Sequence, residues 1–313
     1  MSVYTRINQQ QLETLLSLYP IGKLINFSGI KAGIENTNYN ITTTQGEFIL
    51  TIYESLTAKQ LPAYLLLLTN LSLNDFPSPK PQACRRNKLF SCFNGKPAAL
   101  FNRLPGRSID QPSIIQCREI GEYLAKLHMC SKQLNFNKQN QKNLAGYQSV
   151  FHKIKSQLAK DDITLLNSEL NFQSTYVFPD LPQGVIHADL FKDNVLFERE
   201  RISGIVDFYN ACTDYFLFDI AVTCNDWCII TNSINQQKLN ALLAGYQKVR
   251  IISDEEIKHL PVFLRLTALR FWISRLDHQL NPRKGELTLV KDPRQFRQLV
   301  EFHRANPTKV NLQ

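Results

Sequence analysis

Three polar residues in the segment 185–208 have the types and the spacing that phosphoryl transfer requires. The segment reads VIHADLFKDNVLFERERISGIVDF and contains Asp189, Asn194 and Asp207. Transfer of a phosphoryl group from ATP needs one carboxylate to accept the proton of the acceptor hydroxyl. It also needs an amide oxygen and a second carboxylate to hold Mg²⁺ on the phosphates. The segment therefore predicts Asp189 as the catalytic base and Asn194 and Asp207 as metal ligands.

The intervals between these residues make the pattern specific. The order His187-x-Asp189, then four residues, then Asn194 is that of a kinase catalytic loop. Asp207 follows an Ile-Val stretch and begins Asp-Phe-Tyr, where the kinase metal ligand begins Asp-Phe-Gly. A single aspartate after a strand is usually a turn residue, but the complete set at these intervals indicates a function.

Neighbouring polar residues have simpler interpretations. Asp193 is expected to cap or solvate the loop, and His187 is expected to hydrogen-bond the loop backbone. Asp219 begins a predicted helix in Leu-Phe-Asp-Ile-Ala. Two roles stay open for it, the N-cap of that helix or a brace for the backbone of the catalytic loop.

A turn near the N-terminus has a composition suited to phosphate binding. Residues 29–39 read GIKAGIENTNY and lie between two predicted strands. Gly33 permits close backbone approach, and Asn36, Thr37 and Asn38 offer amide and hydroxyl groups to phosphate oxygens. The turn matches neither G-x-G-x-x-G nor a Walker A loop. Its position ahead of the catalytic loop is what makes it a candidate.

The elements that position these residues begin with a small antiparallel sheet. The capping box Asn8-x-x-Gln11 opens a short helix that ends at Pro20, and Asn94-Gly95 is a strong hairpin signal. An apolar helix is expected at about 57–73. Strands are expected at 23–29, 37–43, 47–53, 88–92 and 97–101.

Helices dominate after residue 105. One begins at Pro112, and further helices are expected at about 146–160, 162–171, 219–230, 235–247 and 254–280. The predicted fold class is α+β with two lobes. A small antiparallel β-rich lobe covers residues 1–104 and a larger, mainly helical lobe covers 105–313, with a hinge near 102–106 and the site in the cleft between them.

The composition excludes several classes of protein. The chain has 313 residues, 43% hydrophobic and 20% charged, which is ordinary for a globular protein and not for a disordered one. The net charge of +9 fits an anionic ligand such as a nucleotide, or a generically basic surface.

The N-terminus has no apolar signal-peptide core and no apolar stretch is long enough to span a bilayer, so a cytoplasmic protein is expected. Seven cysteines without framework spacing indicate reduced thiols, and the pair Cys224 and Cys228 is expected to pack in the core.

Motifs from one end of the chain to the other resemble a known superfamily. The chain resembles the aminoglycoside phosphotransferases and choline kinases, which have a protein-kinase-like fold, and within them the bacterial homoserine kinases. The segments that carry the resemblance are GIENTNY (33–39), HADLFKDN (187–194), DFYNAC (207–212), NDWC (225–228) and LRFWISRL (269–276).

The resemblance implies transfer of the γ-phosphoryl group of ATP to the side-chain hydroxyl of L-homoserine, in threonine biosynthesis. It implies that Asp189 accepts or orients the hydroxyl proton and that Asn194 and Asp207 bind Mg²⁺. The backbone near Asn102 and Leu104 would hold the adenine. The implied partners are this small molecule and the nucleotide, with no nucleic acid and no membrane.

One departure from the kinase pattern concerns the phosphates. Kinases usually pair a cation on the third strand with a glutamate on the crossing helix. Here Thr51 stands at the position of the cation, and residues 55–74 contain no Asp or Glu. Lys31 in the turn or Lys192 in the catalytic loop could supply the missing charge.

A zwitterionic acceptor needs a cation at its carboxylate and an anion at its ammonium. The long helix near the C-terminus offers Arg265, Arg270 and Arg275, and the helix before it offers Asp226. Arginine suits a carboxylate because its planar group donates to both oxygens. We predict Arg270 for the carboxylate and Asp226 for the ammonium, with Trp227 packing in the core.

Three rival hypotheses stay open. A kinase of the same superfamily could act on choline, an aminoglycoside or another amino or hydroxy compound. The missing cation and glutamate suggest a catalytically inactive kinase fold that serves as a binding module, although Asp189, Asn194 and Asp207 are all present. The net charge alone suggests nucleic-acid binding.

Overall fold

The computed structural model describes residues 4–30, 36–132, 134, 136–231, 233–282 and 292–306. The chain divides into two compact units. The first contains the described residues up to Gly106 together with Ser203–Val206. The second contains Arg107–Ile202, Asp207–Pro282 and the described residues after them. The predicted domain boundary after residue 104 stays a prediction, because compactness alone does not show that either part folds by itself.

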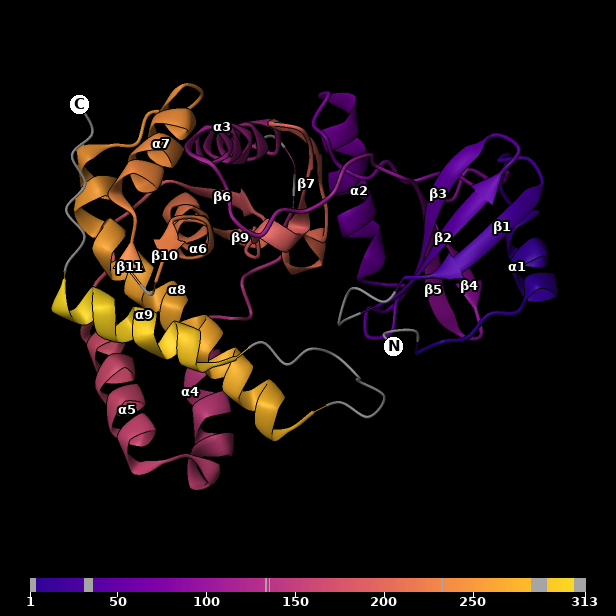
Figure 1. Ribbon diagram of the computed structural model, residues 1–313. Helices are drawn as coiled ribbons and strands as arrows, with labels where there is room; N and C mark the ends of the chain where they lie inside the picture. Colours follow the sequence, from indigo (N-terminus) through magenta and orange to yellow (C-terminus); the bar gives the residue numbers. More distant parts are fainter. Residues whose placement is uncertain are drawn as a thin grey trace. The chain divides into compact units, whose positions relative to one another are not determined.

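The first unit is built on an antiparallel sheet of five strands in the order β1-β2-β3-β5-β4. Figure 1 shows α1 and α2 on either side of this sheet. The predicted sheet and its crossing helix are confirmed, with β4 a few residues later than expected. The elements are α1 (Gln9–Leu16), β1 (Leu24–Gly29), β2 (Thr37–Thr43), β3 (Gly46–Ile52), α2 (Leu61–Leu73), β4 (Ser91–Phe93) and β5 (Lys96–Asn102).

One face of this sheet forms a core cluster with α1. Side chains alternate between faces along a strand, and Thr37, Tyr39 and Ile41 of β2 are all buried. Tyr39 and Ile41 belong to one core cluster with residues of α1. The α1 helix begins with the predicted capping box between Asn8 and Gln11. Residues of β3 and β5 in the same cluster are Phe48, Leu50, Ile52, Ala98 and Leu100.

The second unit is mainly helical, with short strands around the catalytic loop (Figure 1). Strand β6 pairs antiparallel with β9, and β10 pairs with β11. The unit contains α3 (Ile114–Cys130), α4 (Leu144–Ile154), α5 (Lys160–Thr175), β6 (Gln183–Ile186), β7 (Val195–Glu198), β9 (Cys212–Tyr215), α6 (Phe216–Trp227), β10 (Ile229–Ile230), β11 (Ser233–Ile234), α7 (Gln236–Gln247), α8 (Asp254–Leu280) and α9 (Arg294–Ala305). Strand β8 (Arg201–Ile205) follows β7, and its residues from Ser203 on belong to the first unit. The 3-10 turns described in the second unit are η1 (Lys155–Gln157), η2 (Lys192–Asn194) and η3 (Phe208–Asn210).

Two glycines allow α3 and α7 to approach closely. A Cβ added at Gly121 would lie 1.9 Å from the carbonyl oxygen of Leu242, and one added at Gly245 would lie 1.9 Å from that of Arg118. Both distances are far below contact, so neither position accepts a larger residue without separating the helices. This close crossing fixes α3, which carries His128 toward the catalytic loop.

The last described helix, α9, was missing from the sequence prediction. Its buried residues Phe296, Leu299, Val300 and His303 follow helical spacing. His303 Nε2 lies 2.8 Å from Asn225 Oδ1, and Asn225 Nδ2 donates to the carbonyl oxygen of Leu264 at 2.8 Å. The contact therefore connects α9 to α6 and α8 through one buried amide.

The burial of His303 predicts a pH-dependent stability. Burial lowers the pKa of His303 to about 4, whereas histidine in an unfolded chain titrates near 6.5. Between these values the unfolded chain binds the proton and the folded chain does not, so stability is complete above pH 6.5 and falls as the pH decreases. We expect the free energy of unfolding of the native protein to lose about 2 kcal/mol more between pH 7.5 and pH 5 than that of His303→Gln. Urea unfolding at both pH values measures the two losses of unfolding free energy. Equal losses in the native protein and in His303→Gln would contradict the prediction.

Other expectations from the sequence concern the membrane and the thiols. Across the described ranges, no helix combines the length and the apolar character needed to cross a membrane. All seven cysteines are free thiols, and Cys224 and Cys228 are buried, which confirms the predicted core packing. No group of three His, Cys, Asp or Glu residues that could hold a metal ion occurs within the described part of the chain.

Candidate active site

The catalytic loop follows strand β6 and has an unusual backbone. Ala188 has a φ of 64°, in the left-handed region that only glycine adopts easily. The turn is closed by Phe191, whose N–H donates to the carbonyl oxygen of Asp189 at 2.8 Å. A strained residue persists only where its surroundings hold it. The contacts around Ala188 therefore show what positions Asp189.

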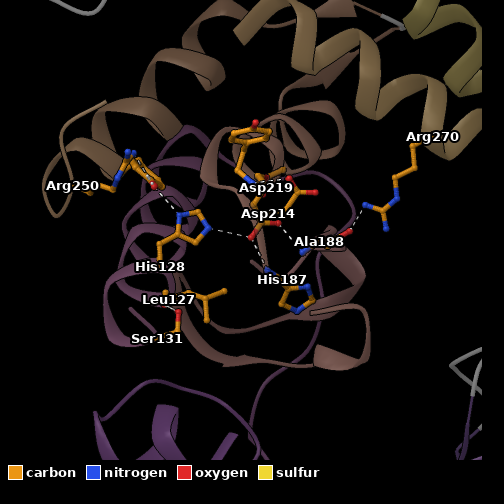
Figure 2. A network of polar contacts seen from close by, with 12 residues as sticks. Leu127, His128, Ser131, His187, Ala188, Asp214, Asp219, Arg250 and Arg270 are labelled. Atoms are coloured by element: carbon orange, nitrogen blue, oxygen red, sulfur yellow. Dashed lines mark hydrogen bonds and ion pairs between the residues drawn. The ribbon is translucent and has the colours of Figure 1, made fainter. Parts of the chain in front are cut away.

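Asp219 in α6 is the main support of this backbone (Figure 2). Its Oδ2 accepts the backbone N–H of His187 at 2.7 Å, and its Oδ1 accepts that of Ala188 at 2.8 Å. The N-cap of α6 is Tyr215, so Asp219 lies in the first turn. The N-cap interpretation of Asp219 is therefore wrong, and the brace interpretation is confirmed.

A buried histidine completes the environment of Asp219. His128 Nε2 lies 3.2 Å from Asp219 Oδ2, and its Nδ1 lies 2.7 Å from the hydroxyl of Tyr246. Burial lowers the pKa of His128, so the ring is neutral and donates from Nε2. Burial alone would raise the pKa of Asp219, but the hydrogen bonds from His128 and from the loop backbone hold it below its ordinary value. Both oxygens of the Asp219 carboxylate thus accept hydrogen bonds from the backbone of the catalytic loop.

Arg270 in α8 supports the other side of the strained residue (Figure 2). Its Nη1 donates to the carbonyl oxygen of Ala188 at 2.6 Å, and its side chain is buried. The guanidinium also lies 4.5 Å from the ring centre of Phe271. Both peptide groups of Ala188 are thereby held, the N–H by Asp219 and the carbonyl by Arg270. The predicted contact of Arg270 with a substrate carboxylate stays a prediction.

The carboxylate of Asp189 is oriented by an amide that the sequence analysis did not single out. Asn210 Nδ2 donates to Asp189 Oδ2 at 3.1 Å, and Asn210 Oδ1 accepts from Lys142 Nζ at 2.6 Å. Asn210 lies in η3, three residues after Asp207. Only its place in the motif DFYNAC could have identified Asn210 from the sequence, since a single asparagine in a turn is common.

Asn194 and Asp207 have the donor set that fits a magnesium ion. Asn194 Nδ2 donates to the carbonyl oxygen of Asp189 at 2.9 Å, which leaves its Oδ1 as an available oxygen ligand. Asp207 has a φ of 65° and begins the turn η3. Amide and carboxylate oxygens are what Mg²⁺ prefers. Both residues belong to the second unit, as does Asp189.

Asp226 supports the far end of the catalytic loop. Its Oδ2 accepts the backbone N–H of Lys192 at 2.7 Å. Arg275 lies within electrostatic range of Asp226, Asp193 and Asp189, although burial lowers its pKa to about 10. The predicted contact of Asp226 with an ammonium group stays a prediction, as does that of Lys192 with phosphate.

Two other predicted residues have structural roles. The Trp227 indole donates to the carbonyl oxygen of Leu190 at 3.0 Å and is buried, which confirms the packing interpretation. Arg265 pairs with Glu169 at 2.7 Å.

The predicted phosphate-binding residues belong to the first unit. Gly33 and Lys31 lie outside the described residues. Asn36 Oδ1 accepts the N–H of Glu54 at 3.4 Å, and the Thr37 hydroxyl donates to Glu54 Oε1 at 2.7 Å. Asn38 Oδ1 accepts from the hydroxyl of Thr51 at 2.7 Å. Asn102 Oδ1 accepts the backbone N–H of Lys80, and Leu104 is half-buried. Their contacts with a nucleotide stay predictions.

A lysine–glutamate pair is present, but it does not replace the one missing from the sequence pattern. Lys96 Nζ pairs with Glu54 Oε2. Ile52 pairs with Ala98 in the sheet and both belong to the cluster with α1. Lys96 lies two residues before Ala98 in β5 and shares that face, and Glu54 reaches it from the bend that follows β3. Thr51, the position of the missing cation, lies on the opposite face. The pair instead ties the N-terminal segment to the sheet, because Lys96 also donates to the hydroxyl of Thr5 at 2.8 Å.

We therefore expect Lys96→Met to affect stability and not nucleotide binding. The substitution leaves Glu54 without its charged donor, which costs about 1–3 kcal/mol of unfolding free energy. The Michaelis constant for ATP should stay within about twofold of the native value, since RT ln 2 is only about 0.4 kcal/mol. Urea unfolding and initial rates at varied ATP measure the two effects. A large increase in the Michaelis constant with unchanged stability would show that the pair does serve the phosphates.

Comparisons with known proteins agree with this geometry. The model of a family described as "Phosphotransferase enzyme family" matches residues 26–252. The chain is 38% identical to a homoserine kinase of Methylobacillus flagellatus over 96% of its own length and 95% of that protein. It is 37% identical to a homoserine kinase of Neisseria meningitidis over 96% of its length and 99% of the relative.

Solved structures of low sequence identity show the same fold. An amicoumacin kinase in complex with AMP-PNP, Ca²⁺ and amicoumacin superposes with a TM-score of 0.71 at 17% identity, over 95% of this chain and 92% of that one. A spectinomycin phosphotransferase superposes with a TM-score of 0.69 at 15% identity, over 96% and 99%. The predicted protein-kinase-like α+β fold is confirmed.

Proposed function

Because this chain belongs to the phosphotransferase enzyme family, we propose that it is an ATP-dependent kinase that phosphorylates the side-chain hydroxyl of L-homoserine. The product is O-phospho-L-homoserine, an intermediate of threonine biosynthesis. The observation that carries this function is the identity of 37–38% with homoserine kinases over nearly the whole of both chains. The local support is the position of Asp189 beside Asn194 and Asn210.

Asp189 acts on the acceptor hydroxyl in this proposal. The hydroxyl proton passes to the Asp189 carboxylate while the oxygen bonds to the γ-phosphorus, and the bond from that phosphorus to the β-γ bridging oxygen breaks to leave ADP. Asn210 fixes the carboxylate by donating to Oδ2, so Oδ1 can face the hydroxyl. Most of the rate then comes from positioning, since a loose phosphoryl transition state needs little covalent help.

The nucleotide and its metal are assigned to residues by the same proposal. Asn194 and Asp207 hold Mg²⁺, which when bound neutralises charge on the phosphate oxygens. The turn with Gly33 and residues 36–38 binds the phosphates, and Lys192 is a candidate for the missing cation. Asn102 and Leu104 flank the backbone that holds the adenine.

The test is ADP release from Mg·ATP by the purified protein with a panel of acceptors. L-Homoserine, L-serine, L-threonine, choline and kanamycin are compared at equal concentration, and we expect turnover with L-homoserine at least tenfold above the others. A higher rate with another acceptor would keep the kinase fold and reject homoserine. The absence of turnover with every acceptor would favour the inactive binding module.

A further inference from the structure

A cavity in the second unit has no part in the mechanism above. Its volume is about 150 Å³, and its wall comes from the start of α4, from α5, from β9 and from α8. Phe178 and Phe263 make part of the wall apolar, and a few polar groups project from the rest. A cavity of about this volume accommodates a molecule of benzene's size. Apolar walls with few polar groups are typical of small-molecule sites.

Gln173 of α5 is the most unusual residue in this wall. Its side chain is 2% exposed, and neither Nε2 nor Oε1 has a hydrogen-bond partner. Buried polar groups are almost always paired, because an unpaired one loses its hydration without compensation. An amide with both ends unpaired matches a ligand that offers a donor and an acceptor close together.

Asp214 of β9 adds a negative charge to the same wall. Its Oδ2 accepts from Asn140 Nδ2 at 2.7 Å and its Oδ1 accepts the N–H of Tyr215 at 2.7 Å. An ionised carboxylate has about four acceptor positions, so it retains capacity for a further donor. Burial raises the pKa of Asp214, and a cation in the cavity would offset this cost of ionisation.

Two hydrogen bonds connect this cavity to the catalytic base. Lys142 lines the cavity, and its Nζ donates to Asn210 Oδ1 at 2.6 Å. Asn210 Nδ2 donates to Asp189 Oδ2 at 3.1 Å. Asn210 therefore contacts both a residue of the cavity wall and the catalytic base.

We propose that this cavity binds the zwitterionic end of the acceptor, with the ammonium on Asp214 and Gln173 Oε1. The carboxylate is held by Gln173 Nε2 and by the charge of Lys142. This inference rests on the proposed function and specifies the amino-acid subsite for it. Asp226 and Arg270 each make a hydrogen bond with the backbone of the catalytic loop instead. The cavity thus supplies both charges that the acceptor needs from residues outside that loop.

Gln173→Met is the decisive variant, since methionine keeps the shape of glutamine without its polar atoms. The Michaelis constant for L-homoserine should rise by about tenfold to a hundredfold, the effect of losing hydrogen bonds to a charged ligand, while kcat changes little. The melting temperature without ligand should rise, because an unpaired buried amide is removed. A merely structural glutamine would lower the melting temperature. Gln237→Met, at an exposed position of α7, is the matched control and should change neither value.

Asp214→Asn tests the ammonium with a second acceptor, 4-hydroxybutyrate, which lacks that group. The native protein should prefer L-homoserine in kcat/KM, and the variant should lose at least about tenfold of this preference, which corresponds to one charged contact. Asp226→Asn is measured beside it. Loss of the preference in Asp226→Asn but not in Asp214→Asn would overturn the inference, as would an unchanged Michaelis constant in Gln173→Met.

The first measurement separates this inference from the proposed function. If the native protein shows no turnover with L-homoserine, the proposed function fails before any variant is compared. If native turnover is normal and both cavity variants retain the native Michaelis constant, only the cavity assignment fails.

Discussion

Asp189→Asn should reduce kcat by about 10²–10⁴-fold, the contribution of a positioned general base. The amide cannot accept the hydroxyl proton, although its Oδ1 can still accept the hydrogen bond from Asn210 Nδ2, which is 3.1 Å from the native carboxylate. The loop is supported mainly through the backbone of His187 and Ala188. The Michaelis constant for ATP and the melting temperature should therefore stay near their native values.

Initial rates of ADP formation with L-homoserine measure this effect, and thermal unfolding checks the fold. Asp193→Asn is the matched control, because it removes the same charge from an exposed position in the same loop. It should retain most of the native kcat. Comparable losses in both variants would mean that the charge of the loop matters and not the position of Asp189.

The part of the site that could be predicted from the sequence is the part that is local in the chain. Asp189 and Asn194 are five residues apart, and the turn between them makes their hydrogen bond a consequence of spacing. The capping box of α1 is predictable for the same reason, since its partners Asn8 and Gln11 are three residues apart. Such features need no knowledge of the tertiary structure.

The supports of the loop depend on contacts between residues far apart. Arg270 contacts Ala188, which lies 82 positions earlier in the chain. The sequence predicts that Arg270 lies on a helix with other arginines, but it does not predict this contact. Gln173 has no motif, because an unpaired amide exists only when other elements enclose it. The same holds for Asp214, whose role depends on the neighbours of β9.

Two features that the sequence analysis did not name have physical explanations. The residues of α9 carry a clear apolar pattern at 296, 299, 300 and 303, so the signal was present and was not used. The position of Lys96 could not be judged from the sequence. Only the register of β3 against β5 shows that it lies on the face opposite to Thr51.

Asp219→Asn should be the most destabilising of the conservative substitutions around the loop. The carboxylate accepts from His187 N, Ala188 N and His128 Nε2 and is fully buried. An asparagine presents one acceptor and one donor group, so its NH₂ faces a group that also donates. Each hydrogen bond lost to a buried charged acceptor costs about 1.5–3 kcal/mol of unfolding free energy. The substitution also releases the strained backbone of Ala188, so kcat should fall by about 10²-fold through misplacement of Asp189.

Urea unfolding and initial rates measure the two effects, and their pH dependence identifies the cause. The pKa of Asp219 is lowered in the folded protein, so its stabilising effect is complete above the ordinary value of about 4 and is lost as the pH falls through the folded value. The difference in stability between the native protein and Asp219→Asn should therefore be full at pH 7 and shrink below pH 4. His128→Gln is the matched comparison, because it removes one donor and leaves both backbone contacts of Asp219. It should lose stability with a much smaller loss of kcat, and an equal loss of kcat in both variants would show that the brace acts through the histidine and not through the loop backbone.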